Sequence, residues 1–306
     1  MGRASELARA LSAGDLIILP TETVYGLAAD AASSAAVARL YEAKGRPRFN
    51  PLISHVGDLD AALGIADLDD RARVLANAFW PGPLTIVAPY RMGGGVCDLA
   101  RAGLNTVAVR VPAHPLARQV LKAFGGPIVA PSANRSGRPS PTTFADAMAE
   151  TGAFTAAALD GGPCPVGLES TVVALLDGPP RLLRPGAVTR AVMEALIGPL
   201  ADAEADAKRS PGRLSRHYAP GAPVRLAAEA PAPGEAYLAF GPAPEGPHVF
   251  NLSPSRDLAE AATRLFTYLR AADALAPRAI AVAPIPEEGL GEAINDRLRR
   301  AAGFVG

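Results

Sequence analysis

The chain has 306 residues, and its 30 Lys and Arg balance its 30 Asp and Glu, so the formal net charge is zero. A neutral chain has no overall basic field that would draw the whole molecule onto nucleic acid, so any anion site must be local. Hydrophobic residues make up 49% and charged residues 20%, which is typical of a soluble globular protein, and the length favours two domains. The two cysteines, the polar N-terminus and the lack of a long apolar run predict a cytoplasmic protein with no membrane contact.

Helix and strand patterns alternate through the first part of the chain, which predicts an α/β domain. Short gaps between the later strands favour a mixed sheet over a purely parallel one. The predicted elements, in chain order, are a helix over 5–14, a strand over 16–20, a helix over 33–45, a strand over 52–56, a helix over 69–80, strands over 84–89 and 106–112, a helix over 114–126, a strand over 127–131, a helix over 142–150, strands near 156–160, 170–176 and 181–184, and a helix over 189–197.

The composition changes after residue 197. A polar, Ala-rich stretch leads into SPGRLSRHYAP at 210–220, and a second β/α pattern then begins. We therefore predict a first domain over 1–197, a linker over 198–222 and a smaller α/β domain over 223–306. The elements predicted in this smaller domain are strands over 224–228, 236–240, 248–252 and 279–285 and helices over 255–272 and 290–302.

Small polar side chains follow two of the predicted apolar strands. Thr21 and Thr23 follow the strand at 16–20, and Ser132 and Asn134 follow the strand at 127–131. Ligands bind at strand ends in α/β sheets because side chains and free backbone amides converge there. For the segment with Thr21 and Thr23, a simple polar turn is an equally good interpretation.

Basic residues occupy positions where a fixed cation would be expected to meet an anion. Lys44, Arg46 and Arg48 gather after a helix C-terminus, where they could bind oxyanions or only complement the helix dipole. Arg110 and Arg184 lie within apolar strands, where an arginine is costly unless it is paired or faces a pocket. For Arg110 the alternative is a buried structural ion pair.

Several established motifs are absent from the sequence. It has no P-loop signature, no GxGxxG fingerprint, no serine-nucleophile elbow and no metal-ligand spacing among its histidines and cysteines. Cys164 is therefore interpreted as a passive thiol, and a core role is favoured for His55 when it is taken alone. The Thr, Ser, Asn, Lys and Arg side chains at the strand ends are suited to bind and orient anions. They favour a nucleotide-using enzyme, with an RNA-binding module as the alternative.

Taken together, these segments resemble the threonylcarbamoyl-AMP synthase family with its YrdC-like fold. The resemblance covers essentially all of 5–195, and the tail from 210 onward is similar to the two-domain long form of that family. The matching motifs are PTETVYGLAADA at 20–31, KGRPRFNPL at 44–52, TVAVRVP at 106–112, PSANRSG at 131–137, GPCPVGLESTVV at 162–173 and LRPGA at 183–187.

The resemblance implies a twisted, mixed α/β sheet with a positively charged cavity and a Rossmann-like C-terminal domain. It also implies a nucleotidyltransferase that converts L-threonine, bicarbonate (or CO₂) and ATP into L-threonylcarbamoyladenylate and pyrophosphate. A separate downstream transferase would pass the threonylcarbamoyl group to tRNA next to the anticodon, so direct nucleic-acid binding is expected to be weak or absent. Mg²⁺ is expected to arrive with ATP, with no metal ligands from protein side chains.

Residue by residue, the resemblance implies three sets of roles. Lys44 and Arg46 would be catalytic, by stabilising charge on the phosphates. The threonine subsite would be formed by Thr21 or Thr23, His55, Arg110, Ala130 and Ser170. The ATP site would be formed by Lys44, Arg46, Arg48, Thr106, Ser132, Asn134, Ser140, Arg184, His217 and Tyr218.

Three further expectations concern the 210–220 segment, Arg48 and the arginines near the C-terminus. The resemblance also implies that the 210–220 segment lies across the mouth of the cavity as a lid. Its prolines and glycine would fix its path. Arg48 could touch phosphate or only solvent. Arg297, Arg299 and Arg300 are interpreted as a solvated helix face, with tRNA or partner docking as the alternative.

Overall fold

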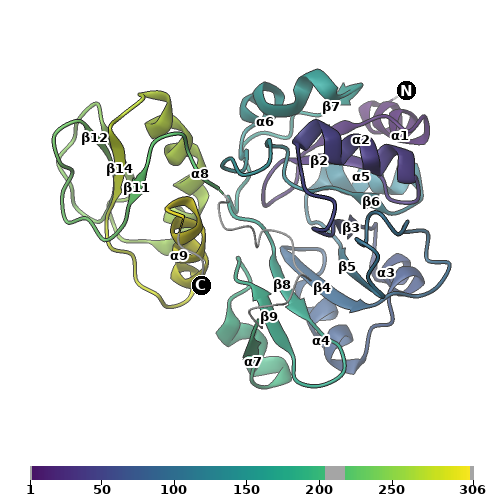
Figure 1. The fold of residues 1–306 in the computed structure, drawn as a ribbon. Coiled ribbons are helices and arrows are strands. Elements are labelled where there is room, and N and C mark those ends of the chain that lie inside the picture. Colours follow the sequence, from purple (N-terminus) through teal and green to yellow (C-terminus); the bar gives the residue numbers. More distant parts are fainter. Residues whose placement is uncertain (1, 204–217, 304–306) are drawn as a thin grey trace.

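The computed structural model describes residues 2–203 and 218–303. In this described part the chain forms two domains, each built on its own sheet (Figure 1). The larger has a ten-stranded sheet and the smaller a four-stranded sheet. The two-domain α/β architecture expected from the sequence is confirmed.

The larger sheet is mixed, as the short gaps between its later strands indicated. Its strand order is β10-β9-β8-β4-β5-β3-β6-β2-β1-β7, with β3 parallel to β5 but β4 antiparallel to β5. Its strands are β1 (Ile17–Leu19), β2 (Gly26–Asp30), β3 (Ile53–His55), β4 (Leu84–Pro89), β5 (Thr106–Arg110), β6 (Ile128–Val129), β7 (Ala157–Ala158), β8 (Thr171–Ala174), β9 (Arg181–Arg184) and β10 (Ala201–Asp202).

The helices of the larger domain begin and end largely at the signals in the sequence. Ser33 caps α2 by accepting a hydrogen bond from the amide of Ala36, and Gly45 ends that helix in the left-handed conformation. The helices are α1 (Arg3–Ser12), α2 (Ser34–Lys44), α3 (Leu59–Ile65), α4 (Asp70–Phe79), α5 (Pro115–Phe124), α6 (Phe144–Thr151) and α7 (Arg190–Ile197), with a 3₁₀ turn, η1, at Gly152–Phe154.

Three elements were not predicted. The β2 segment, GLAAD, has low strand propensity and is a strand because it pairs with β1 on one side and β6 on the other. The seven-residue α3 is too short to show a clear helical period. β10 pairs with β9, so the first sheet reaches into the range that the sequence assigned to the linker.

Strand register places the polar residues of the site next to one another. His55 and Arg110 are partners at the ends of the parallel strands β3 and β5. Arg184, at the end of β9, is the partner of Val172 near the start of β8. Because β4 lies between β5 and β8, these residues come from one region of the sheet.

The smaller domain packs its helices against the larger one. Figure 1 shows α8 and α9 between the second sheet and the first domain. The hydrophobic cluster around Leu265 and Phe266 of α8 also contains Val24 and Leu168 of the first domain, so apolar packing continues across the junction. The strands, all parallel in the order β11-β14-β12-β13, and the helices are β11 (Val224–Arg225), β12 (Glu235–Phe240), β13 (Val249–Ser253), α8 (Leu258–Ala274), β14 (Ala279–Val282) and α9 (Leu290–Ala301).

Candidate functional site

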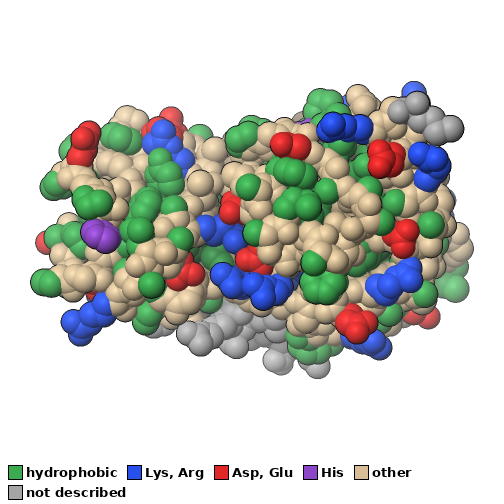
Figure 2. All heavy atoms as spheres, turned by 90° about the horizontal axis from the view of Figure 1, so that it is seen from above, with side chains coloured by type: hydrophobic (Ala, Val, Ile, Leu, Met, Phe, Trp, Pro, Cys, Tyr) green, Lys and Arg blue, Asp and Glu red, His purple; other side chains and the backbone are tan. Residues whose placement is uncertain are grey.

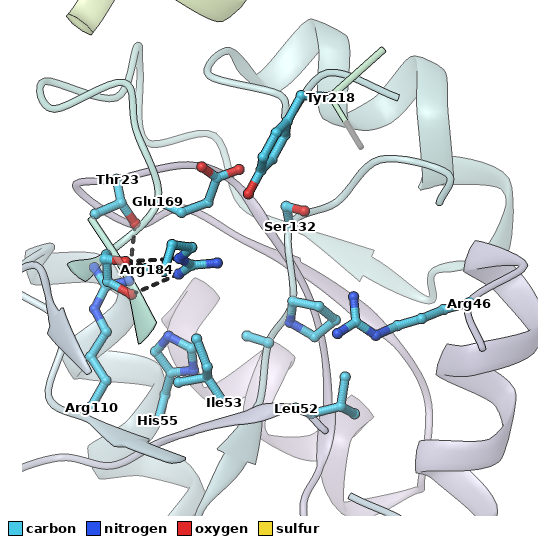
Figure 3. A pocket seen from close by; sticks show the side chains of 13 residues that line it. Thr23, Arg46, Leu52, Ile53, His55, Arg110, Ser132, Glu169, Arg184 and Tyr218 are labelled. Atoms are coloured by element: carbon cyan, nitrogen blue, oxygen red, sulfur yellow. Dashed lines mark hydrogen bonds between the residues drawn. The ribbon is translucent and has the colours of Figure 1, made fainter. Parts of the chain in front are cut away.

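A cavity opens where the site-bearing strands end. It encloses about 490 Å³ of empty space, including the part that is open to solvent. Figure 3 shows Arg46 reaching this space from the side opposite Arg110 and His55, with Glu169 and Tyr218 above them. The lining residues are Thr23, Arg46, Leu52, Ile53, His55, Arg110, Ala130, Pro131, Ser132, Glu169, Ser170, Arg184 and Tyr218. The three arginines against one glutamate make the lining positive, as expected from the sequence.

Arg110 forms a buried ion pair and also lines the cavity, so it satisfies both interpretations given for it, a structural pair and a pocket-facing arginine. Its guanidinium donates to a carboxylate oxygen of Glu22, to the hydroxyl of Thr23 at 3.0 Å and to the carbonyl of Gly82 at 3.2 Å. Burial alone would raise the pKa of Glu22, but the charge and hydrogen bond of Arg110 outweigh it and lower that pKa. The pair therefore stays ionised at neutral pH and fixes the guanidinium in place.

Thr21 and Thr23 occupy different places. The Thr21 hydroxyl donates to the carbonyl of Val24 at 2.6 Å and accepts from that residue's amide at 3.2 Å, so it closes its own turn. It also lies 2.8 Å from the Thr23 hydroxyl. Thr23 lines the cavity, while Thr21 supports it from behind.

His55 is a buried, neutral imidazole at the cavity wall. Burial, with Arg110 nearby, lowers its pKa to about 3. Within the described part of the chain its Nδ1 has no hydrogen-bond partner. A buried polar atom without a partner is costly, so a ligand atom placed here would gain from bonding to it.

Arg46 supplies a cation to the wall that faces Arg110. Burial lowers its pKa to about 10, which leaves it charged at neutral pH. One terminal nitrogen donates to the Pro51 carbonyl at 3.2 Å, and its buried Nε has no partner among the residues that the structure describes. Arg46 is thus a guanidinium with unused donors at the cavity.

Lys44 serves the loop that carries Ser132 and Asn134. Its ammonium donates to the carbonyls of both residues and is fully buried, and burial lowers its pKa well below the usual range. It does not line the cavity. The Asn134 side chain in turn donates to the carbonyls of Arg135 and Arg138 at 2.8 Å each.

Arg184 is positioned by the segment that enters β8. Its Nε and one terminal nitrogen donate to the Ser170 carbonyl at 3.1 and 2.9 Å, and the terminal nitrogen also reaches the Ser170 hydroxyl at 3.2 Å. That hydroxyl lies 2.7 Å from the hydroxyl of Thr85. Gly186 makes this packing possible, because a Cβ there would lie 2.4 Å from the Thr171 amide nitrogen.

Through α9 the second domain contacts Glu169, one of the residues that line the cavity. Arg297 donates to a carboxylate oxygen of Glu169 at 3.0 Å and to the Pro185 carbonyl at 2.8 Å, and its guanidinium lies 5.5 Å from the centre of the Tyr218 ring. Only 1% of Arg297 is exposed, so its interpretation as part of a solvated helix face was wrong. Exposed Arg299 pairs with Glu287. Figure 2 shows further basic and acidic side chains along the junction between the domains.

The structure brings most, but not all, of the predicted site residues to the cavity. Nine line it: Thr23, Arg46, His55, Arg110, Ala130, Ser132, Ser170, Arg184 and Tyr218. His217 lies outside the described residues, as does most of the 210–220 segment. Those that do not line the cavity are Thr21, Lys44, Arg48, Thr106, Asn134 and Ser140.

Arg48 and Thr106 lie outside the cavity lining. Arg48 is exposed in the turn after α2. Thr106 starts β5, four positions before Arg110, so it lies toward the other end of that strand. Ser140 is close by, because its hydroxyl donates to Glu169.

Sequence reasoning missed four lining residues, namely Leu52, Ile53, Pro131 and Glu169. Leu52 and Ile53 read as ordinary strand residues. Glu169 offered a signal that was not used, because a carboxylate beside Ser170 in an apolar context needs a buried cation. That cation is Arg297, which no local pattern connects to it.

Three further observations limit what the described residues can do. The described residues contain no group of three His, Cys, Asp or Glu side chains that could hold a metal ion. Burial raises the pKa of Cys164 to about 12, so this thiol is protonated at neutral pH. Over residues 2–203 and 218–303 no helix combines the length and apolar character needed to cross a bilayer.

Comparison with known proteins places both domains. Residues 9–186 match the family described as "Telomere recombination", and residues 188–303 match the "Threonylcarbamoyl-AMP synthase, C-terminal domain". The threonylcarbamoyl-AMP synthase of Pyrococcus abyssi is 38% identical, with 95% of this chain and 91% of the relative covered. That of Bacillus subtilis is 36% identical over 98% and 92%. The crystal structure of P. abyssi Sua5 complexed with L-threonine superposes with a TM-score of 0.91 and 36% identity, covering 98% of this chain and 94% of that one. The chain therefore belongs to the threonylcarbamoyl-AMP synthase family of enzymes.

Proposed function

We propose that this chain condenses L-threonine, bicarbonate (or CO₂) and ATP into L-threonylcarbamoyladenylate and releases pyrophosphate. The observation that carries the proposal is the cavity itself. A fixed arginine with hydroxyls and a neutral imidazole lies on one side, and a second arginine with unused donors lies on the other. The threonylcarbamoyl-AMP synthases of P. abyssi and B. subtilis match this chain over both of its domains.

The threonine subsite would lie beside Arg110. Its terminal nitrogens bond to Glu22 and Thr23 and still carry N–H groups that can meet a carboxylate. The unpartnered Nδ1 of neutral His55 could accept a hydrogen bond from the amine or hydroxyl of threonine. Ala130 and Ser170, which line the cavity, would complete this subsite. The similar P. abyssi Sua5 has been crystallised in complex with L-threonine, which supports threonine as a substrate.

The nucleotide would occupy the opposite side. Arg46, Ser132 and Arg184 would face its phosphates, and Tyr218 would cover it from the second-domain side. Lys44 would act mainly by holding the loop of Ser132 and Asn134. The roles at the nucleotide that the resemblance implies for Arg48, Thr106, Ser140 and His217 stay predictions.

The reaction would proceed by in-line attack. A carbamate oxygen of N-carboxy-threonine would attack the α-phosphorus of ATP, and pyrophosphate would leave. Positioned cations are the main requirement of such a transfer. Mg²⁺ would be bound by the ATP phosphates and water, since the described residues hold no acidic cluster for it, and would neutralise phosphate charge.

The product would be used by a separate transferase that modifies adenosine next to the anticodon of tRNA. No strong binding of tRNA by this chain is proposed, because the lining mixes arginines with small hydrogen-bonding residues. Among its described residues Tyr218 and the His55 imidazole are the aromatic rings, too few for a stacking series. A cytoplasmic location would follow from this role and stays a prediction.

Pyrophosphate release that depends on threonine and bicarbonate tests the proposal. Arg46→Met should lower kcat by on the order of 10²–10³ because a phosphate contact is lost. Arg91→Met, which removes an exposed arginine paired with Asp67, is the matched control and should keep wild-type turnover. If the wild-type chain bound RNA in a salt-dependent manner and showed no threonine-dependent turnover, the RNA-binding alternative would replace the synthase.

Lys44→Met provides a second variant for the same assay. Its loss should raise KM for ATP more than it lowers kcat, because the ammonium acts on ATP through the loop carbonyls. A fall in kcat with unchanged KM would instead place Lys44 at the reacting phosphates, as the sequence predicted.

A further inference from the structure

Among the described residues that line the cavity, Glu169 is the single carboxylate. It lies directly before Ser170, in the segment that enters β8, and the Ser140 hydroxyl donates to one of its oxygens. A bare carboxylate at this place would repel the phosphates of ATP and compete with them for the nearby arginines. The charge of Glu169 must therefore be neutralised if the cavity is to bind an anion.

The neutralising charge is supplied by the second domain. Arg297, on α9, donates to the other Glu169 oxygen at 3.0 Å and is itself held by the Pro185 carbonyl and by Asp296, each at 2.8 Å. Since its side chain is 1% exposed and does not line the cavity, it approaches Glu169 from behind. Such a geometry neutralises the carboxylate without placing a cation in the ligand space.

Two of the three arginines that line the cavity, Arg46 and Arg184, depend on this pairing. Arg110 is matched by Glu22. Within residues 2–203 and 218–303, neither Arg46 nor Arg184 has a carboxylate within ion-pair distance, so both retain their charge for a ligand. Arg184 bonds to Ser170, the residue next to Glu169, so a Glu169 released by Arg297 would have a cation close at hand.

We propose that Arg297 is a positioning residue of the second domain, which withdraws the charge of Glu169 from the cavity and thereby keeps Arg46 and Arg184 available to bind the anionic substrate. The identity of that anion as ATP rests on the proposed function. The second domain thus takes part in substrate binding, although its own sheet lies away from the cavity. Displacement of α9 from the first domain would expose the Glu169 charge and weaken anion binding.

The test measures binding of two probes, inorganic pyrophosphate and ATP, by titration calorimetry on the full chain. Arg297→Met should weaken both by on the order of tenfold, because an unpaired carboxylate then acts at close range in a poorly solvated site. In turnover assays, the same variant should raise KM for ATP with a smaller change in kcat. The matched control is Arg299→Met, two positions away on the same helix and exposed, which should bind both probes like the wild type.

A second substitution separates this role from simple structural support. With Glu169→Gln added, the double variant has no unpaired carboxylate at the cavity. Its affinity for both probes should therefore recover to within about threefold of that of Glu169→Gln alone. If Arg297→Met fails to fold, comparison of the double variant with Glu169→Gln alone still decides the matter. Unchanged probe affinity in Arg297→Met, or a double variant that binds about tenfold more weakly than Glu169→Gln, would overturn the proposal.

The outcomes for the two proposals are distinct. A wild-type chain that binds pyrophosphate without threonine-dependent turnover would contradict the proposed function and leave the role of Arg297 standing. A wild-type chain with threonine-dependent turnover whose Arg297→Met variant binds both probes unchanged would contradict the role of Arg297 and leave the proposed function standing.

Discussion

Arg110 and Glu22 form a buried ion pair at the wall of the cavity, and the same arginine bonds to Thr23, which also lines it. The pair both stabilises the fold and orients a guanidinium toward the ligand space. The two roles can be separated by substitution.

Arg110→Met should destabilise the protein by about 3–5 kcal/mol, because Glu22 is left as a buried charge without its cation. Denaturant unfolding measures this loss. The double variant Glu22→Gln, Arg110→Met should regain part of the stability, since no unpaired charge remains, yet should not regain threonine-dependent turnover. Recovery of turnover in the double variant would contradict a contact between Arg110 and substrate.

Thr23→Val should raise KM for threonine by on the order of tenfold, because it removes a hydroxyl at the cavity wall while keeping the side-chain shape. Thr21→Val should mainly lower stability, by about 1 kcal/mol, because its hydroxyl closes the turn at Val24. Steady-state kinetics and thermal unfolding of both variants check this division. The reverse pattern would show that Thr21 contacts the substrate.

His55 should make the stability of the protein depend on pH. Its folded-state pKa of about 3 lies below its ordinary value of 6.5, so below pH 6.5 the unfolded chain binds a proton that the folded chain does not. Stability should therefore be constant with respect to this group above pH 6.5 and fall by about 1.4 kcal/mol per pH unit below it.

Urea unfolding between pH 6.5 and 5 measures that slope, in a window above the ordinary pKa of Glu22. His55→Gln should flatten the slope, whereas substitution of the exposed His248 by Gln serves as the control for a surface imidazole. An equal slope in wild type and His55→Gln would refute a neutral, buried His55.

Gly186→Ala should destabilise the protein by about 2 kcal/mol or more and lower turnover. The added Cβ would lie 2.4 Å from the Thr171 amide and 2.7 Å from the Glu169 carbonyl, which are backbone atoms that cannot easily move. Gly64→Ala in α3 is the matched control, because no atom lies within 4 Å of its added Cβ. Thermal unfolding compares the two, and an equal effect would contradict close packing at Gly186.

Local patterns were sufficient for much of the fold. Caps, glycine stops and apolar periods predicted helices such as α2 and α5, and the uneven strand spacing indicated a mixed sheet. They failed for β2, where pairing with β1 and β6 overrides the weak strand propensity of Gly and Ala.

The sequence predicted the candidate site in part, because residue type and strand position point to a site but do not show which contacts each side chain makes. In-strand position and burial cost pointed to Arg110 and Arg184, and the polar strand ends pointed to Thr23 and Ser132. The same residue types could not show that Lys44 turns onto loop carbonyls, that Thr21 turns onto its own backbone, or that Arg48 stays in solvent.

By itself, the sequence determined the two α/β domains, the family and the residue types of an anion-binding cavity, because these depend on periodicity, local backbone limits and ordered motifs. Only the tertiary structure decided which donors remain unused and which are already paired, because those pairings join residues far apart in the chain. Arg297 and Glu169, 128 positions apart, are the clearest case. Read locally, Arg297 belonged to a solvated helix face and Glu169 to the start of a strand, and their packing across the domain junction makes them a buried pair at the cavity.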